Sequence, residues 1–506
     1  MRNFMRILTL ALALLMLVGC FAACGGEPAG TTERPSDSTQ KESEEDPRKA
    51  VKDTVPTNLN LKDDTVTFFT RNDSDIYTYE LACEELLNNT VYDAVHYRNI
   101  DVENRLNVKI KTIGQPGSWA DLKSWTQTLS TAVLTSSGDF DGAAFYLSYG
   151  STLAKEGIYF NLMNLTKDFG GGHLNFEKPW WNQTMVDELS VYNALFFAGG
   201  SLTLSEVQNG CCLFFNKDLF NKLFPDKTSD ALYASVRAGT WTADEMAEYV
   251  AAGWEDVNSN GVIDDGDVVG IRMHAIGQSA GQMDGWVVAM GLDLTEMNVY
   301  GEPEISLFNS RTIPAYEKVR NIFGNNPGAF LTVGNVTQTY MQNGNQLFKS
   351  DTLKFGSDMR ASDVLYGVLP LPKYDAEQED YRTCFGNGSS CLAICSDLSP
   401  ERASSVSAVL ELLSAESYKQ VIPVYYETVL QGQYSRDEAD AEMYDRILNS
   451  FVFSFGFAYS TQSLDSLGSI FRDMSPTFDI QTHIDSKRIS WETKLADLLN
   501  ALEAVS

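Results

Sequence analysis

The most constraining feature of this sequence is the alternation of short apolar strands with amphipathic helices along most of its length. The segments 65–70 (TVTFFT) and 141–147 (DGAAFYL) are short and apolar enough for strands, and 106–113 (LNVKIKTI) alternates apolar and polar residues with a period of two. Strands that alternate with helices predict an α/β architecture. A chain of 506 residues is too long for one small core, so we expect two or more lobes.

Helix starts are marked by capping patterns. Residues 242–245 (TADE) form a capping box that opens a helix over 246–252. Ser399, followed by a proline, opens another helix with one apolar face. We also expect a helix to begin over 152–157 and an amphipathic terminal helix over 489–505, and we find no internal repeat.

The first nineteen residues have the pattern of a secretion signal. Two arginines precede an uncharged run over 7–19, which as a helix would span only about 20 Å and is too short to cross a bilayer. The run ends in Leu-Val-Gly before Cys20, and this resembles a bacterial lipobox. We therefore predict a signal peptide over 1–19 and lipidation of Cys20, with Cys24 as the alternative. A lipid there would anchor the exported protein to the outer face of the cell membrane without spanning it.

Residues 20–61 are predicted to be a flexible tether. They are rich in Gly, Ser, Thr, Pro and acidic residues and contain almost nothing apolar to bury. No later run in the sequence is long enough for a membrane-spanning helix.

The charge balance excludes two classes of partner. The chain has 68 acidic and 38 basic residues, a formal net charge of −30. A nucleic-acid-binding protein needs a basic face, and so does a protein that binds anionic lipid headgroups through its surface. We therefore expect no nucleic acid and no membrane contact other than the lipid anchor.

Six cysteines remain when Cys20 and Cys24 are set aside, and no two of them form a C-x-x-C pair. A zinc ribbon or a thioredoxin-like site is therefore not supported. An exported protein permits disulfides, and Cys384 with Cys391 or Cys395 is the nearest candidate pair in the sequence. Buried free thiols are the simpler expectation, because spacing does not give connectivity.

An acidic loop over 256–267 (DVNSNGVIDDGD) has the pattern of a calcium loop. Calcium takes several oxygen ligands from a tight turn, with a glycine at position six and a backbone carbonyl at position seven. The residues at the ligand positions are Asp256, Asn258, Asn260, Val262, Asp264 and Asp267. The last ligand is Asp where Glu is usual, and two are neutral. We predict a structural Ca²⁺ site, with a solvated Asx/Gly turn as the alternative.

Two enzyme readings compete with a binding function. Residues 277–281 (GQSAG) match the G-x-S-x-G nucleophile motif around Ser279, but only His483 lies downstream to serve as its base. A pair of carboxylates for glycoside hydrolysis is always available among 68 acids, yet none stands out by its context. We expect no enzyme activity, with an exported carbohydrate-active or ester hydrolase as the alternative.

Several segments, taken in order, resemble one family. They are 139–162 (strand, loop and helix), 182–219 ending in NKDL, 239–242 (GTWT) followed by the acidic loop, and 366–373 (YGVLPLPK). This order resembles the extracellular solute-binding proteins of bacterial ABC importers, of the family 1 sugar-binding type that includes maltose-binding protein. The resemblance spans residues 62 to about 480.

The resemblance implies a two-lobed periplasmic-binding-protein-like fold of type II, in which α/β lobes are joined by crossing hinge strands and close on a ligand. Carried onto this chain, lobe one is 62–203 plus 388–447. Lobe two is 204–387 plus 448–506.

The resemblance also implies a ligand site in the cleft between the lobes. Sugars are held by aromatic faces and by Asp, Asn and Arg side chains that bond hydroxyls. The positions that match the cleft are Arg71, Asn72, Asp73, Tyr146, Ser148, Tyr149, Trp181, Asp284, Trp286, Asp351 and Asn387.

The function implied is that of a lipid-anchored receptor of an ABC importer. It would bind a carbohydrate, an oligosaccharide above all, and deliver it to permease subunits, and we expect it to be a monomer. The remaining alternative outside the enzymes is a surface lipoprotein without a role in transport.

Overall fold

The computed structural model describes residues 46–169, 171–274, 281–332, 339–434 and 437–506. Contacts divide the chain into a unit 1–47 and a compact unit 48–506, and everything below concerns the second. The predicted signal peptide, the two candidate lipidation sites and Ser279 lie outside the described residues. In the part of the chain that the structure describes, every helix is too short or too polar to cross a membrane.

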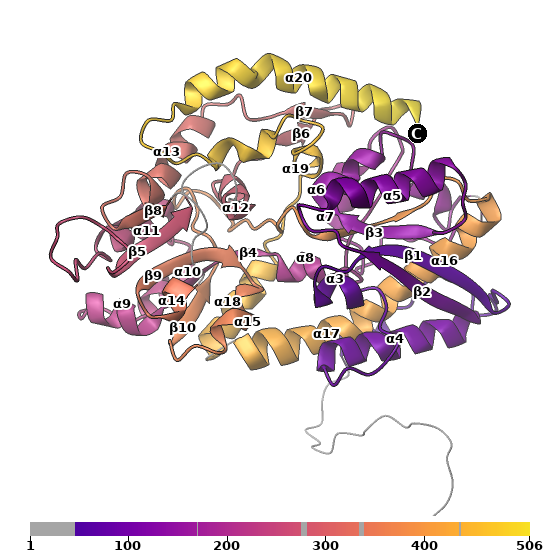
Figure 1. Cartoon of the computed structure of the whole chain (residues 1–506), viewed down its shortest axis with the longest axis horizontal. Coiled ribbons are helices and arrows are strands. Elements are labelled where there is room, and N and C mark those ends of the chain that lie inside the picture. Colours follow the sequence, from indigo (N-terminus) through magenta and orange to yellow (C-terminus); the bar gives the residue numbers. More distant parts are fainter. Residues whose placement is uncertain (1–45, 170, 275–280, 333–338, 435–436) are drawn as a thin grey trace, which may run out of the picture. The chain divides into compact units, whose positions relative to one another are not determined.

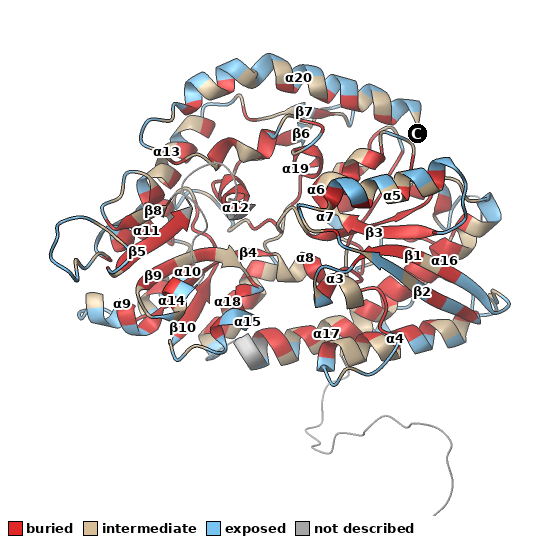
Figure 2. Ribbon diagram, viewed as in Figure 1, coloured by how far each residue is buried: buried red, intermediate tan, exposed pale blue. Residues whose placement is uncertain are grey.

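Counted over the described ranges, the first sheet contains four strands. In spatial order they are β11 (Ser390–Ile394), β3 (Gly142–Tyr146), β1 (Asp64–Arg71) and β2 (Val108–Gln115). β1 pairs in parallel with both β2 and β3, and β11 joins β3 in the antiparallel direction. Figure 2 shows that most of these strands are buried, because helices cover both faces of the sheet. The three strands predicted from the sequence are therefore present, with ends shifted by one or two residues.

Three long helices accompany this sheet (Figure 1). They are α4 (Thr90–Leu106), α5 (Leu122–Leu134) and α16 (Pro400–Glu416). The side chain of Ser399 accepts a hydrogen bond from the N–H of Arg402, so the predicted cap of α16 is present. The guanidinium of Arg402 then pairs with Asp141 and Asp64, which fastens α16 to the beginning of two strands.

The segment after β3 differs from the prediction of a helix over 152–157. A short helix α6 (Leu147–Gly150) and a 3₁₀ turn η2 (Ser151–Leu153) follow the strand directly. The chain then turns at Gly157, whose φ of +72° is left-handed and suits glycine. The helix stops early because the next residues rejoin the first sheet, where Tyr159 bridges Cys395.

In the part of the chain that the structure describes, the second sheet contains five strands of mixed direction. In spatial order they are β10 (Tyr366–Leu369), β4 (Cys211–Asn216), β9 (Gln346–Thr352), β5 (Val269–His274) and β8 (Ala329–Thr332). The helices packed with it include α9 (Lys217–Leu223), α10 (Asp230–Ala238), α11 (Ala243–Ala251), α13 (Thr312–Phe323) and α18 (Glu438–Leu448). Thr242 caps α11 by accepting from the N–H of Glu245, as the capping box predicted.

Within the described residues, the chain passes between the two sheets three times. The first passage is helix α8 (Leu204–Gln208), and the second is the segment 383–389 that leads into β11. The two lie side by side, since Gly210 bridges Phe385 and the N–H of Ser390 donates to the Oγ of Ser205 at 2.9 Å. This is the predicted two-lobed α/β fold with crossing hinge strands.

The third passage runs from α16 to α18 through two π-helical segments. These are η4 (Ser417–Val421) and η5 (Tyr425–Tyr434), separated by the short α17 (Ile422–Val424). The predicted end of lobe one at 447 falls at the far end of α18, whereas α18 packs against β10 of the second sheet. The predicted lobe boundaries, including the end of lobe one at 447, stay predictions.

The last part of the chain lies beside both lobes. It consists of α19 (Phe455–Tyr459), the 3₁₀ turn η6 (Leu467–Phe471) and α20 (Ile480–Ala504), next to the hairpin β6 (Thr295–Met297) and β7 (Pro303–Ile305). α20 begins earlier than the predicted residue 489, because Asp479 caps it by accepting from the N–H of Thr482. In Figure 1 this helix runs along the top of the view.

Candidate functional site

Aromatic and polar side chains gather at the carboxyl ends of β1, β2 and β3. Arg71 ends β1, Trp119 follows β2, and Tyr146 ends β3. These three strands are parallel, so their carboxyl ends meet at one edge of the sheet, the usual place for ligands in α/β folds. Of the predicted residues, Arg71, Tyr146, Tyr149 and Asn387 are brought together here.

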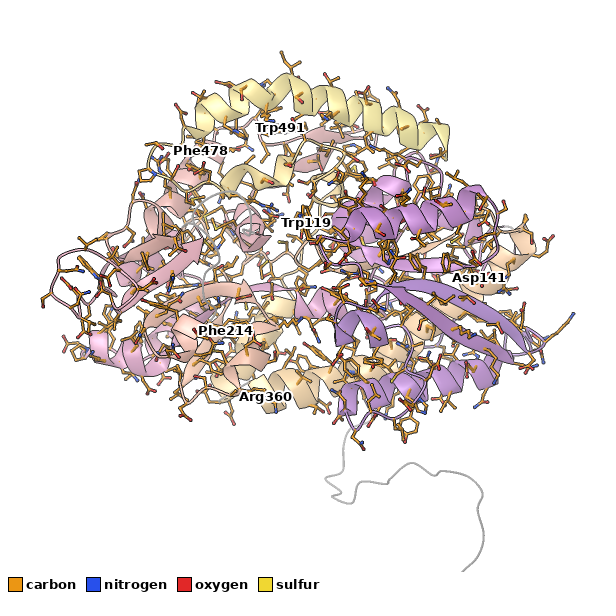
Figure 3. All side chains as sticks on the ribbon, viewed as in Figure 1. Trp119, Asp141, Phe214, Arg360, Phe478 and Trp491 are labelled. Atoms are coloured by element: carbon orange, nitrogen blue, oxygen red, sulfur yellow. The ribbon has the colours of Figure 1, made fainter. Side chains whose placement is uncertain are left out.

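Trp119 is the most exposed aromatic side chain at this edge. It is 57% exposed, and in Figure 3 it lies on the side of the first lobe that faces the second. Its ring meets Tyr146 edge-on at a centroid distance of 6.2 Å and Tyr149 at 6.3 Å. Two tyrosines thus support an indole face that is open to solvent, the surface on which a sugar ring stacks. The sequence analysis missed Trp119, although a tryptophan in a Pro-Gly-Ser turn after a strand was an available signal.

Arg71 is buried beneath this cluster and positions it. Its Nη2 donates to the carbonyl of Gly388 at 2.8 Å and to the Oγ of Ser390 at 2.9 Å. Its guanidinium lies 3.5 Å from the ring centroid of Tyr77 and 5.1 Å from that of Tyr146. Arg71 therefore links the end of β1 to the second passage between the lobes.

Tyr146 and Asn387 connect the cluster to the same passage. The hydroxyl of Tyr146 donates to the Oδ1 of Asn387 at 3.0 Å, and burial raises the pKa of Tyr146 to about 12. The carbonyl of Asn387 accepts from the N–H of Ser148 at 3.1 Å. A Cβ at Gly388 would lie only 3.2 Å from the Tyr146 ring, so a larger residue there would press on the tyrosine.

The first two predicted residues after β1 are both exposed. Asp73 accepts a hydrogen bond from the N–H of Gly117 at 3.1 Å and so holds the turn that carries Trp119. Asn72 packs beside Gly114 in the neighbouring strand. Ser148, by contrast, is fully buried.

A nearly buried ion pair joins α12 of the second lobe to the segment after η6. Asp284, on α12 (Gly281–Ala289), accepts from the Nε and Nη2 of Arg472 at 2.7 and 2.5 Å. Burial raises the pKa of Asp284 above its usual value, and Arg472 acts against this shift. Both charges have a small influence on the pKa of Tyr146. Arg472 was not predicted, because nothing in its sequence context distinguishes it.

Three predicted ligand residues have partners within the second lobe or the protein interior. Trp286 is fully buried and donates to the Oγ of Ser350, so it belongs to the core of the second lobe. Trp181 is 4% exposed and donates to the buried carboxylate of Glu411. Asp351 is occupied by a 3.0 Å ion pair with Lys349. The two indoles contribute packing and hydrogen bonds to the interior instead of a face to the cleft.

The acidic loop 256–267 forms a tight turn held by its own side chains. The carboxylate of Asp256 accepts from the N–H of Gly261 at 2.7 Å, and Gly261 has a left-handed φ of +75°. The side-chain amides of Asn258 and Asn260 donate to the Oδ2 of Asp264 at 3.0 and 2.7 Å. Together with the N–H of Gly266, they lower the pKa of Asp264.

One predicted calcium ligand points into the protein. Asp267 is fully buried and accepts from the indole of Trp254 and the N–H of Val257. Among the described residues there is no group of three or more His, Cys, Asp or Glu side chains arranged to hold a metal ion.

Sequence comparison does not identify the chain, but structural comparison defines its fold. No family model and no curated protein matches the sequence. The galacto-N-biose/lacto-N-biose I-binding protein of an ABC transporter from Bifidobacterium longum, solved with lacto-N-biose, matches with a TM-score of 0.54 at 12% identity, over 86% of this chain and 98% of that one. A cyclo/maltodextrin-binding protein solved with maltotetraose matches with a TM-score of 0.51 at 12% identity, over 88% and 97%. The chain therefore has the fold of the sugar-binding proteins of ABC transporters, as the resemblance implied.

Proposed function

We propose that this protein is an extracellular, lipid-anchored receptor of an ABC importer that binds an oligosaccharide between its two lobes. The exposed indole of Trp119 carries the proposal, because it offers a flat apolar face beside polar groups at the mouth of a sugar-binding fold. Aromatic faces stack on the C–H surface of sugar rings, while Asn387 and the Asp284–Arg472 pair are suited to hydroxyl groups. The supporting structural relatives were solved with oligosaccharides.

Replacing Trp119 by alanine is expected to weaken oligosaccharide binding about 10- to 100-fold, because it removes the stacking face and its apolar area. Isothermal titration with maltotetraose and lacto-N-biose measures the effect on whichever sugar the wild-type protein binds. Tyr300→Ala is the matched control, since Tyr300 is 85% exposed on the β6–β7 turn and should leave affinity unchanged. Equal affinity in the wild type and Trp119→Ala would show that the ligand lies elsewhere.

Measuring product formation distinguishes a receptor from an enzyme. A sugar that binds only the native state raises the midpoint of thermal unfolding. If the protein is a receptor, we expect this rise without any product formation. Product formation from a bound oligosaccharide, or from a generic ester, would support the exported hydrolase. A midpoint that no sugar moves would favour a surface lipoprotein without a transport role.

The anchor and the transport partners are part of the same proposal. Residues 1–19 would be removed on export, and Cys20, or Cys24 as the alternative, would carry the lipid. Permease subunits would receive the sugar. Mass spectrometry of the mature N-terminus from membranes distinguishes the two cysteines, and an unmodified N-terminus would contradict lipidation.

We further propose that the loop 256–267 binds Ca²⁺ in a structural role. Its oxygen ligands are those that calcium prefers, and Gly261 provides the turn that the pattern requires. Titration of chelator-treated protein is expected to show binding of one Ca²⁺, weakened about tenfold or more in Asp264→Asn, because that change removes a charge from the ligand set. Asp375→Asn, on a different loop, is the control. Absence of binding at millimolar Ca²⁺ would contradict the proposal.

A further inference from the structure

Two cysteines far apart in the sequence meet beside the passages between the lobes. Cys211 is the first residue of β4, just after the first passage, and Cys384 belongs to the second passage. The N–H of Cys211 donates to the carbonyl of Cys384 at 2.9 Å, so the two residues are direct neighbours across antiparallel backbones. Their Sγ atoms are 3.9 Å apart, although 173 positions separate them in the chain.

This pair differs from the one that the sequence made the nearest candidate. Cys391 lies in β11 with its Sγ 4.0 Å from the Sδ of Met185, and Cys395 lies just beyond the end of β11 in the first lobe. Cys212 follows Cys211 directly, and because strand side chains alternate it faces the other side of β4, where Asp351 influences its thiol. Among the described residues, Cys211 and Cys384 therefore have the geometry of a pair.

The pair packs against α12, the helix that carries Asp284. A Cβ at Gly285 would approach the Sγ of Cys211 to 2.8 Å, so α12 packs closely on this sulfur. Asp284, the neighbouring residue on α12, bears the ion pair with Arg472. Both sulfur atoms are buried, and the contact with Cys211 together with burial raises the pKa of the Cys384 thiol.

We propose that Cys211 and Cys384 form a disulfide that fastens the first and second passages to each other at the second lobe. The proposal depends on the proposed extracellular location in one respect, because that compartment supplies the oxidant. The oxidant is a disulfide of a small molecule or of an enzyme. A Cys211 thiolate attacks that disulfide and releases one thiolate. The Cys384 thiolate then attacks the Cys211 sulfur and releases the second. The two cysteines lose two protons and two electrons, and the oxidant becomes two thiols.

The bond has a definite effect on the hinge. It joins the residue that leaves the first passage to the second passage, so the two passages must move as one unit at their second-lobe end. Because the closed loop is long, the crosslink also restricts the unfolded chain strongly. Since the folded pair is buried, we expect the bond to form during folding and to resist small thiols until the protein unfolds.

The test counts thiols in the full chain after export or after refolding with glutathione disulfide. Alkylation in denaturant, with mass spectrometry, should find two of the six cysteines other than Cys20 and Cys24 protected from the reagent. Cys212→Ser should keep this protection, whereas Cys211→Ser and Cys384→Ser should each lose it. Alkylation of all six cysteines in the wild-type protein, or protection that disappears in Cys212→Ser but not in Cys211→Ser, would overturn the proposal.

Thermal unfolding provides a second measurement. A strong reductant added to unfolding protein should lower the midpoint by on the order of 5 °C in the wild type and in Cys212→Ser, and by much less in Cys211→Ser. An equal shift in all three would contradict the disulfide. Oligosaccharide binding is measured on the same samples: its absence contradicts the receptor function, and a full thiol count contradicts only the disulfide.

Discussion

Replacing Arg472 by methionine is expected to lower the free energy of unfolding by about 3–5 kcal/mol at pH 8, the largest single effect that we predict. The reason is the environment of Asp284, which is 5% exposed and whose carboxylate receives both hydrogen bonds of the guanidinium. Methionine conserves much of the side-chain volume but leaves the carboxylate buried without its counter-charge. Denaturant unfolding at constant pH measures the loss.

The control for this change is an exposed ion pair of the same kind. Arg237 pairs with Glu442 at 2.7 Å, but the two side chains are 45% and 35% exposed, and Glu442 also contacts Arg446. Arg237→Met should therefore cost less than about 1 kcal/mol. The double variant Asp284→Leu/Arg472→Met removes both charges and should recover much of the stability lost in Arg472→Met. A loss in Arg472→Met no greater than in Arg237→Met would contradict the argument.

The second large prediction is that two buried glutamates make the protein less stable as the pH rises from about 5 to above 7. Burial raises the pKa of Glu206 to about 7 and that of Glu411 to about 7. In the unfolded chain both would ionise near pH 4.5, so between these values the folded state binds more protons. Their contribution is complete below the unfolded pKa and is lost as the pH passes the folded pKa, on the order of 3 kcal/mol per group.

The slope of stability against pH, not the stability itself, tests this prediction. Glu206 receives hydrogen bonds from Gly200, Thr203 and Asn182, all of them donors, so Glu206→Gln will lower stability at every pH. It should nevertheless flatten the decline between pH 5 and 8, because the amide does not titrate. Glu296→Gln, at an exposed position of β6, should keep the wild-type slope.

Two histidines change the stability in the opposite direction over part of this pH range. Burial lowers the pKa of both His173 and His483, so the folded state binds fewer protons at those sites, and stability falls as the pH drops below the unfolded value of about 6.5. Comparing each variant with the wild type removes their contribution. An unchanged slope in Glu206→Gln would show that Glu206 does not titrate in this window.

Much of the fold could be predicted from the sequence, because its strands and helix starts are determined by residues close together in the chain. Short apolar runs predicted β1 and β3, and the alternation of apolar and polar residues predicted β2. Capping residues predicted the starts of α11 and α16, since a cap depends on neighbouring residues. The helix expected over 152–157 failed for a tertiary reason: the chain leaves the helical path at Gly157 to rejoin the first sheet.

The candidate site could be predicted from the sequence only for residues at the ends of strands. Arg71 and Tyr146 terminate parallel strands, so their meeting could be predicted, although their role as ligand contacts remains a prediction. Exposed tryptophans could not be distinguished from buried ones in this way. Trp119 and Trp286 both occur near glycines, yet one is exposed and the other is fully buried beside Ser350, a difference that depends on contacts distant in the sequence.

Helix α20 has a mechanical consequence for the movement of the lobes. Just before its first turn, the carbonyl of Phe478 accepts from Arg320 of α13 in the second lobe at 3.2 Å. Just beyond its other end, Val505 lies where a side chain at Gly157 of the first lobe would touch it. Twenty-five helical residues make a rod of about 37 Å that is attached at both ends. Moving the lobes apart must bend this helix or detach one of its ends. We therefore expect α20 to limit how far the two lobes can open.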